Sequence, residues 1–160
     1  MNLRIGFGVD VHRLSDGLPL MLGGISVPSD KGAVGHSDAD VLLHAICDAI
    51  LGACNLRDIG FHFSDKDPQF KGIDSSLLLT QVMDLVQQKK YLVVNVDSTI
   101  ILESPKVSSY IPLMQEKIAQ LLRVPIDCIT VKATTHEAVD SFGQRNAVKA
   151  YATVLMNKAE

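Results

Sequence analysis

The pattern of apolar and polar positions predicts a chain in which strands and helices alternate. Residues 3–14 form an apolar, β-favouring run, and 18–22 form a short apolar strand that Gly23 and Gly24 end, before a polar loop to about Ser37. Helical spacing of apolar residues predicts three helices, which run from Ser37 or Asp38 to about Cys54, from Asp74 or Ser75 to about Lys90, and from Ser108 or Ser109 through Leu122. Further β-rich runs predict strands at 92–102, 128–133 and 147–156.

These elements predict an α+β fold of two layers, a mixed β-sheet with three helices packed on one face. No repeat, linker or low-complexity tract divides the 160 residues, so we expect a single domain over 1–160. Residues 55–74 show no clean period, although they contain Phe and Ile. A loop of this length inside a compact domain is usually functional.

The composition, with 47% hydrophobic and 21% charged residues, is that of an ordinary globular protein. The formal net charge of −3 gives no overall attraction to nucleic acids or anionic membranes. Cys47, Cys54 and Cys128 are odd in number and form no CxxC pair, so we expect reduced thiols and not a disulfide framework. The sequence carries no signal peptide and no apolar run of membrane length, so we expect a cytoplasmic protein.

Asp10 and His12 are the first candidate site residues. In a strand, residues i and i+2 point to the same face, so a carboxylate and an imidazole would project side by side. His44 falls at the edge of the apolar stripe of the first predicted helix, where a helix meets a site without entering the core. One Asp and two His would form a three-ligand zinc site, and catalytic zinc keeps its fourth position open for water or substrate.

The same spacing also fits a half-exposed strand edge beside a boundary histidine whose hydrogen bonds are satisfied within the fold. Asp40 and Asp48 flank His44 by one helical turn on each side. One of the two is expected to orient the His44 ring through a hydrogen bond. The alternative is that both are solvated helix charges.

Short motifs in a fixed order extend the candidate site along the chain. They are Asp10-Val11-His12, His36-Ser37-Asp38-Ala39-Asp40, His44, Asp58-Ile59-Gly60, Asp65-Lys66-Asp67-Pro68, Pro105-Lys106 and Lys132-Ala133-Thr134-Thr135-His136-Glu137. No single motif is decisive. The ordered set, over residues 4–156, closely resembles the 2-C-methyl-D-erythritol 2,4-cyclodiphosphate synthase family of the non-mevalonate isoprenoid pathway.

The resemblance implies an enzyme, a phosphorus–oxygen lyase, that converts 4-diphosphocytidyl-2-C-methyl-D-erythritol 2-phosphate to the 2,4-cyclodiphosphate and CMP. The 2-phosphate of the substrate would attack its β-phosphorus. Two phosphates repel each other, so positioning and charge neutralisation should supply most of the catalysis. The resemblance also implies a homotrimer with its active sites at subunit interfaces, and no nucleic-acid or membrane partner.

The same resemblance assigns roles to individual residues. Asp10, His12 and His44 would bind one zinc ion per subunit, and Glu137 would hold a second divalent cation, Mg²⁺ or Mn²⁺, that bridges the diphosphate. Catalytic roles would fall to Lys132, Thr135 and Glu137. The expected substrate contacts are His36 and Ser37 for the erythritol phosphate, Asp58, Ile59 and Gly60 for the erythritol hydroxyls, Phe63 and Asp65 in a flap over 61–73, Pro105 and Lys106 for cytidine, and Ala133, Thr134 and Thr135 for the diphosphate.

The chain departs from the family's common pattern in one segment and at one position outside it. After Glu137 the family commonly continues with a Gly-Phe-Thr-Gly-Arg-Gly-Glu segment, whereas residues 138–146 keep only Gly143 in place and shift the basic residue to Arg145. Val9 replaces a common Phe just before the metal-ligating Asp. In the family these positions line a cavity on the trimer axis that holds isoprenoid diphosphates. We hypothesise that this chain has lost or altered that ligand site.

Two other functions fit parts of the pattern. A zinc phosphoesterase would use the metal to activate water for attack on phosphorus, but it needs a general base beside the metal, and the sequence offers none. A non-catalytic nucleotide-binding module would hold a structural zinc, which usually has four protein ligands. His62 and His136 have no expected role in the site.

Overall fold

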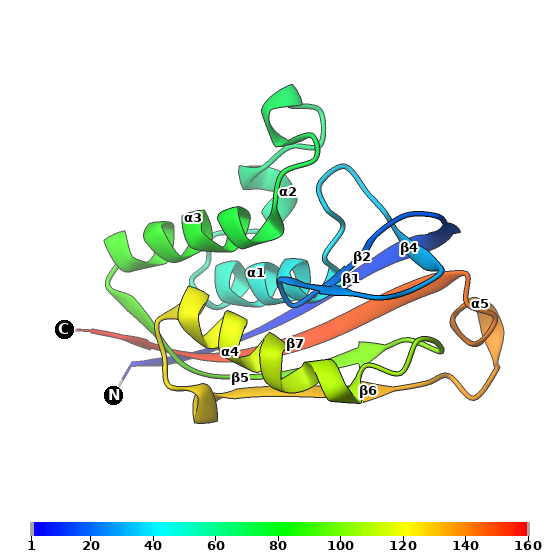
Figure 1. The fold of residues 1–160 in the computed structure, drawn as a ribbon. Helices are drawn as coiled ribbons and strands as arrows, with labels where there is room; N and C mark the ends of the chain where they lie inside the picture. Colours follow the sequence, from blue (N-terminus) through cyan, green and yellow to red (C-terminus); the bar gives the residue numbers. More distant parts are fainter. Residues whose placement is uncertain (1, 160) are drawn as a thin grey trace.

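The computed structural model describes residues 2–159, and its main element is a five-stranded sheet in the order β4-β1-β7-β5-β6 (Figure 1). Its strands are β1 (Leu3–Asp16), β4 (Lys31–Val34), β5 (Tyr91–Ile101), β6 (Ile129–Thr134) and β7 (Ala147–Lys158). Only the β5–β6 pair is parallel, so the sheet is mixed, as predicted. A separate two-stranded sheet pairs β2 (Leu20–Leu22) with β3 (Ile25–Val27).

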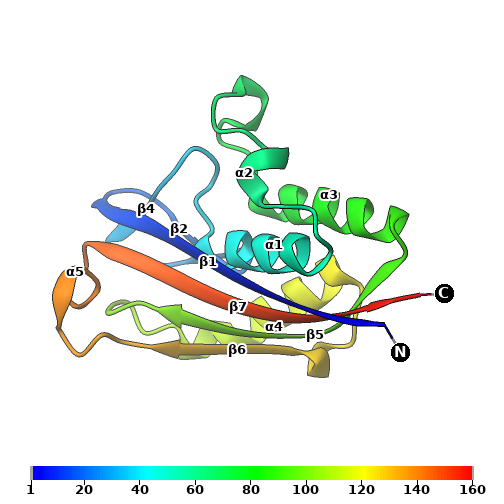
Figure 2. The ribbon, with the colours of Figure 1, turned by 180° about the vertical axis from the view of Figure 1, so that it is seen from behind.

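Three longer helices pack with this sheet. They are α1 (Val41–Ala53), α3 (Ser75–Gln88) and α4 (Ile111–Leu122). Helix α1 packs against β1 and β7, α4 packs against β6, and α3 packs against α1. Both α1 and α4 lie behind the strands in the rear view (Figure 2). Shorter helical turns are α2 (Ile59–His62), α5 (Asp140–Gly143) and the 3₁₀ turns Pro68–Phe70, Ser108–Tyr110 and Ile126–Cys128.

The predicted start of the first helix was wrong by two or three residues, since its cap is Asp40 and not Ser37 or Asp38. Ala39 adopts a left-handed φ of 56°, which interrupts any helix begun at Ser37 or Asp38. Asp40 is the true N-cap, because its buried carboxylate accepts hydrogen bonds from the backbone N–H groups of Leu42 and Leu43. The predicted polar loop before this helix was also wrong in part, since it contains β3 and β4.

The contact between α1 and β1 depends on two glycines. Gly6 and Gly8 lie on the strand face that meets the helix, and a Cβ atom built on them would lie 1.8 Å from the Ala49 carbonyl oxygen and 2.0 Å from that of Ala45. No side chain fits in that space, so the helix backbone rests directly on the strand backbone. This close packing brings the first turn of α1 to the same strand face as Asp10.

The opposite face of β1 carries large apolar side chains without cover. Ile5 is 74% exposed, Phe7 64%, Val11 50% and Val9 41%. An apolar row of this kind is typical of a surface that associates with another protein chain. Over residues 2–159, none of the helices combines the length and apolarity that crossing a membrane requires.

Replacing Gly8 by Ala should destabilise the protein. The added Cβ overlaps the Ala45 carbonyl, so α1 must move away from β1, and we expect the free energy of unfolding to fall by about 1–3 kcal/mol. The matched control is Gly52→Ala within α1, where nothing lies within 4 Å of the added Cβ. That change should raise the free energy of unfolding by about 0.5–1 kcal/mol. Urea denaturation of both variants checks the pair, and equal stabilities would contradict the packing argument.

Candidate metal and substrate site

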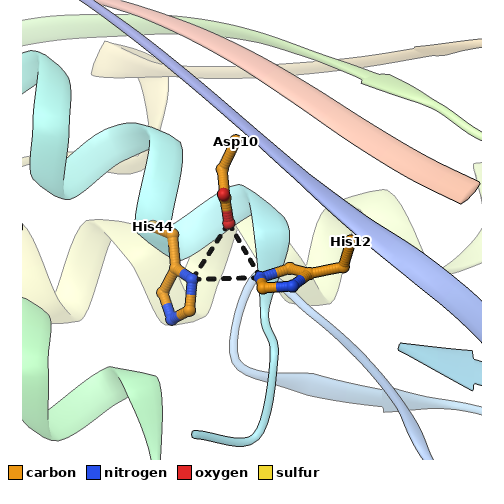
Figure 3. A group of neighbouring side chains, drawn as sticks. All are labelled: Asp10, His12 and His44. Atoms are coloured by element: carbon orange, nitrogen blue, oxygen red, sulfur yellow. Dashed lines mark hydrogen bonds and ion pairs between the residues drawn. The ribbon is translucent and has the colours of Figure 1, made fainter. Parts of the chain in front are cut away.

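Asp10 and His12 from β1 and His44 from α1 converge on one point (Figure 3). The Oδ2 atom of Asp10 lies 2.9 Å from Nε2 of His12 and 3.0 Å from Nδ1 of His44. The two ring nitrogens are 3.3 Å apart. One oxygen and two nitrogens, all within 4.8 Å of one another, are suited to hold a metal ion. The predicted grouping of these three side chains is therefore confirmed, and the identity of any ion stays a prediction.

The other nitrogen of each ring has a partner on the protein. Nδ1 of His12 lies 3.1 Å from the carbonyl oxygen of Val34, and Nε2 of His44 lies 2.9 Å from Oγ of Ser75 and 3.2 Å from Oγ of Ser37. A ring that donates its outer N–H to such an acceptor keeps an unprotonated nitrogen for a metal. The donor set and its surroundings therefore fit zinc, with three protein ligands and a position open toward the adjacent cavity.

The charges of the cluster favour ionised groups. Burial raises the pKa of Asp10, but hydrogen bonds and positive charge from His12 and His44 outweigh it and lower that pKa to about 2. Burial lowers the pKa of His44, but the hydrogen bond and charge of Asp10, with smaller contributions from Asp40 and Asp38, raise that pKa overall.

A cavity of about 440 Å³ opens beside the three ligands. It brings together most of the residues expected to contact the erythritol end of the substrate, namely His36, Ser37, Ile59, Gly60, Phe63 and Asp65. Three further apolar residues line it: Phe70 and Ile73, which lie within the predicted flap over 61–73, and Leu78, which the sequence did not indicate. Asp58 is not in the lining, because its carboxylate caps α2 by accepting from the N–H of Phe61.

Hydrogen bonds tie the predicted flap to the floor of this cavity. The N–H of Gly72 donates to the carbonyl of His36 at 2.7 Å, and the N–H of Asp38 donates to the carbonyl of Ile73 at 3.0 Å. Within the flap, the rings of Phe63 and Phe70 meet edge to face with their centroids 5.4 Å apart. The far end of the flap is thus anchored to the same loop that carries His36 and Ser37.

A second cavity, of about 230 Å³, lies at the end of β6. Its lining contains five predicted residues, namely Pro105, Lys106, Ala133, Thr134 and Thr135. It also contains Glu103 and Ser108, which the sequence did not indicate. Lys132 and Glu137 do not line either cavity in this chain. Lys132 pairs with Asp97 at 2.7 Å, and Glu137 accepts a hydrogen bond from the Thr135 hydroxyl.

The two cavities lie at the same level of the sheet but far apart across it. One row of paired residues crosses the sheet between them. It begins at Val11 of β1, between Asp10 and His12, and passes through Lys149 of β7 and Ile101 of β5. It ends at Thr134 of β6, at the edge of the second cavity. Three strand spacings of about 4.8 Å separate the ends of this row by roughly 14 Å. The two cavities share no lining residue.

The predicted orientation of His44 by Asp40 or Asp48 was wrong. The carboxylate of Asp40 binds the N–H groups of Gly23 and Gly24 as well as the start of α1, and Asp48 accepts from the N–H of Ile59. The N–H groups of Leu42 and Leu43 at the start of α1 are thus already occupied by Asp40. The ring of His44 instead contacts two serines, and the contact with Ser75 has no signal in the sequence, because Ser75 is 31 residues away.

The two remaining histidines have ordinary partners, as expected. The ring of His62 contacts the Leu56 carbonyl at 2.8 Å, and the ring of His136 pairs with Asp140 at 3.0 Å. In the divergent segment 138–146, Arg145 forms an ion pair with Asp30 of the same chain.

Comparison with known proteins gives one consistent family. A family model described as the YgbB family matches residues 3–157. The chain is 53% identical over 160 residues to a protein of Phocaeicola vulgatus, covering all of both chains. It is also 53% identical over 153 residues to a protein of Porphyromonas gingivalis, covering 96% of this chain and 94% of the relative. Both relatives are named 2-C-methyl-D-erythritol 2,4-cyclodiphosphate synthase.

Solved structures agree with this relationship. The bifunctional IspDF of Campylobacter jejuni superposes with a TM-score of 0.95 at 35% identity, over 99% of this chain and 43% of that one. A 2C-methyl-D-erythritol-2,4-cyclodiphosphate synthase in its CDP-bound form superposes with a TM-score of 0.89 at 36% identity, over 96% of this chain and 100% of that one.

The raised pKa of His44 predicts a pH-dependent metal affinity. A metal ion bound at Nδ1 would have to displace a proton from it, so the affinity should fall about tenfold per pH unit below the pKa of His44. The same proton stabilises the metal-free fold fully below the unfolded-state pKa near 6.5, and this stability is lost as the pH rises through the raised folded-state pKa. Chelator competition from about pH 5 to 8 measures the affinity, with His62→Gln as control. A flat profile would contradict the cluster as the binding site.

Proposed function

Since the chain belongs to the YgbB family, whose relatives are 2-C-methyl-D-erythritol 2,4-cyclodiphosphate synthases, we propose that its two cavities carry out that reaction in isoprenoid biosynthesis. The observation that carries the proposal is the Asp10, His12 and His44 cluster on the wall of the larger cavity. A carboxylate and two imidazoles around an open position are the ligands that a phosphate-binding zinc enzyme needs.

The reaction closes a ring between two phosphates of one substrate. An oxygen of the 2-phosphate forms a bond to the β-phosphorus, and the bond from that phosphorus to the oxygen it shares with the α-phosphorus breaks. The shared oxygen and its electron pair leave with CMP. When bound, zinc at Asp10, His12 and His44, and a second divalent cation such as Mg²⁺ or Mn²⁺ at Glu137, would neutralise the charge that opposes this approach.

The larger cavity would hold the erythritol phosphate. His36 and Ser37 lie in its lining beside the metal-binding cluster, where they would hold the 2-phosphate in line for attack. Gly60, with no side chain, would offer its backbone to the erythritol hydroxyls, and its neighbour Ile59 lies in the cavity lining beside it. Phe63 and Asp65 stand on the flap segment and would exclude water when substrate is bound. The Oδ1 atom of Asp58 caps α2, so we propose that Asp58 accepts a hydrogen bond from an erythritol hydroxyl through its other carboxylate oxygen, Oδ2.

The smaller cavity would hold the CDP end. Pro105 and Lys106 lie in a wall that has backbone groups and no aromatic platform, which suits reading of the cytosine edge. The Thr134 and Thr135 hydroxyls and the Ala133 backbone would contact the diphosphate. Related structures described as CDP-bound support a nucleotide ligand of this kind. The catalytic roles of Thr135, Glu137 and Lys132 are part of the proposal, and for Lys132 the role requires release from Asp97.

We propose that the complete site forms between copies of the chain in a homotrimer. The substrate must touch both cavities, yet within one chain they lie roughly 14 Å apart across the sheet. The uncovered row of Ile5, Phe7, Val9 and Val11 provides an apolar surface for neighbouring copies, on the sheet face away from the proposed layer of three helices. The larger cavity of one copy would then face the smaller cavity of the next.

The remaining features of the proposal follow from the reaction. The enzyme would be a phosphorus–oxygen lyase formed by a single domain, since the family match extends over residues 3–157. The net charge of −3 gives no overall attraction to nucleic acids or anionic membranes, so we propose neither as a partner, and we propose a cytoplasmic location. A zinc phosphoesterase is less favoured, because the family match and the related CDP-bound structures support the cyclisation instead.

Phosphorus NMR with substrate, zinc and Mg²⁺ tests the reaction directly. We expect resonances of a cyclic diphosphate together with released CMP. Asp10→Ala should lower the rate by at least about 10³-fold, because it removes a ligand of the proposed metal. Linear hydrolysis products would contradict the proposal and support the phosphoesterase, and binding without turnover would support the nucleotide-binding module.

The same assay tests whether the site is shared between copies. Asp10→Ala damages the larger cavity and Thr135→Ala the smaller one, and each variant alone should be nearly inactive. Co-expression should restore activity at about a quarter of the sites, since random trimers place an intact larger cavity against an intact smaller one at that frequency. No recovery, with both variants trimeric by light scattering, would place the whole site within one chain.

We also propose that this chain has lost the family's isoprenoid diphosphate site. Arg145 is held by Asp30 of its own chain, and Val9 offers less apolar surface than the common Phe. Titration with geranyl or farnesyl diphosphate, followed by calorimetry, should therefore show no saturable binding outside the active site. Micromolar binding that survives a saturating concentration of CDP would contradict this proposal.

A further inference from the structure

Ser75 connects the metal ligand His44 to a carboxylate. Its side chain is fully buried at the first residue of α3. The Oγ atom of Ser75 lies 2.9 Å from Nε2 of His44, and the hydroxyl donates a hydrogen bond to the Oδ1 atom of Asp38. The three side chains therefore form a continuous row that leads away from the metal-binding cluster.

The direction of each proton in this row is set by chemistry. An ionised carboxylate only accepts hydrogen bonds, so Asp38 takes the single hydroxyl proton of Ser75. The oxygen of Ser75 can then only accept from the ring of His44, which places the ring proton on Nε2. Nδ1 is left with a free electron pair, and Nδ1 is the atom that faces Asp10 and His12.

We propose that Ser75 and Asp38 are positioning residues that fix the tautomer and the orientation of His44, so that Nδ1 is presented to zinc. This inference rests on the proposed zinc site and assigns to it two residues that supply no ligand atom. Ser37 also lies near Nε2, at 3.2 Å, but its hydroxyl proton is not committed to a carboxylate. Ser37 is therefore compatible with either tautomer, and Ser75 selects one.

Asp38 is itself held firmly. Its Oδ2 atom accepts from the N–H of Ser75 at 3.1 Å, and its Oδ1 atom accepts from the N–H of Asp40 at 3.2 Å. Its own N–H donates to the carbonyl of Ile73, at the end of the flap. These bonds fix the carboxylate in place before any metal arrives, so orienting His44 costs little on binding.

A purely structural role explains the Ser75 hydroxyl less well. The N-cap of α3 is Asp74, whose side chain already accepts from the N–H of Ser76. The Ser75 hydroxyl is therefore not needed to cap the helix. Ser76, the next residue, is also buried, but its hydroxyl has no hydrogen-bond partner among the described residues, which makes it a matched control.

Zinc affinity of the full-length protein, measured by chelator competition at constant pH, tests the inference. Ser75→Ala should weaken zinc binding by about 10- to 100-fold, the usual effect of removing a partner of a metal-ligating histidine. Ser76→Ala should leave the affinity within about twofold of the wild type, since it removes a hydroxyl without a partner. Equal affinities of Ser75→Ala and Ser76→Ala would overturn the inference.

Nitrogen-15 NMR of the zinc-loaded wild-type protein gives a second readout that needs no variant. We expect zinc on Nδ1 of His44 and a slowly exchanging proton on Nε2. Zinc on Nε2, or an Nε2 proton that exchanges at the rate of an exposed histidine, would overturn the inference even if Ser75→Ala failed to fold. A wild-type protein that binds no zinc would overturn it together with the proposed metal site. If the wild-type protein turns over its substrate but Ser75→Ala leaves the zinc affinity unchanged, the inference is overturned while the proposed function stands.

Discussion

The backbone contact between α1 and β1 is the constraint on which the rest of the site depends. Gly6 and Gly8 remove every side chain from the strand at that point, and small residues of α1 supply the opposing surface. The helix axis is thereby brought close enough for His44 to reach side chains on the strand. A metal-binding cluster with donor atoms about 3 Å apart tolerates little displacement of either element, so the glycines serve the site as much as the core.

A second constraint fixes the start of that helix. The Asp40 carboxylate is fully buried and binds four backbone N–H groups, two from the glycine turn before β3 and two from α1. Burial raises its pKa, and the hydrogen bonds from Gly24, Leu43 and Gly23 oppose that rise. One side chain thus determines where the helix begins and where the small second sheet sits. The loop between them, which carries His36, Ser37 and Asp38, is held at both ends.

The sequence predicted the mixed sheet, the long helices and the metal-binding cluster because each has a local signal. Asp10 and His12 share a strand face by their spacing, and His44 lies on a regular amphipathic helix. The errors arose where distant backbone groups decide the local structure. Nothing near Asp40 in the sequence indicates that its carboxylate binds the N–H groups of Gly23 and Gly24. These contacts hold Asp40 as the N-cap, so the helix begins later than predicted. In the same way Ser75 resembles a helix cap, and only the tertiary fold shows that its hydroxyl faces His44. The assignments of Lys132 and Glu137 came from resemblance alone, and within one chain neither lines a cavity.

The separation of the two cavities across one sheet has a consequence for how activity relates to folding. In the proposed homotrimer, a chain in which each cavity is well formed would still lack a working site, so folding and assembly would be successive equilibria with separate constants. Specific activity would then depend on protein concentration, falling on dilution while the circular dichroism of each chain stays unchanged. A substitution could then abolish activity in two ways, by unfolding the chain or by weakening the association between copies. Higher expression would raise the assembled fraction in the second case, because association depends on concentration, whereas the folding equilibrium of each chain does not.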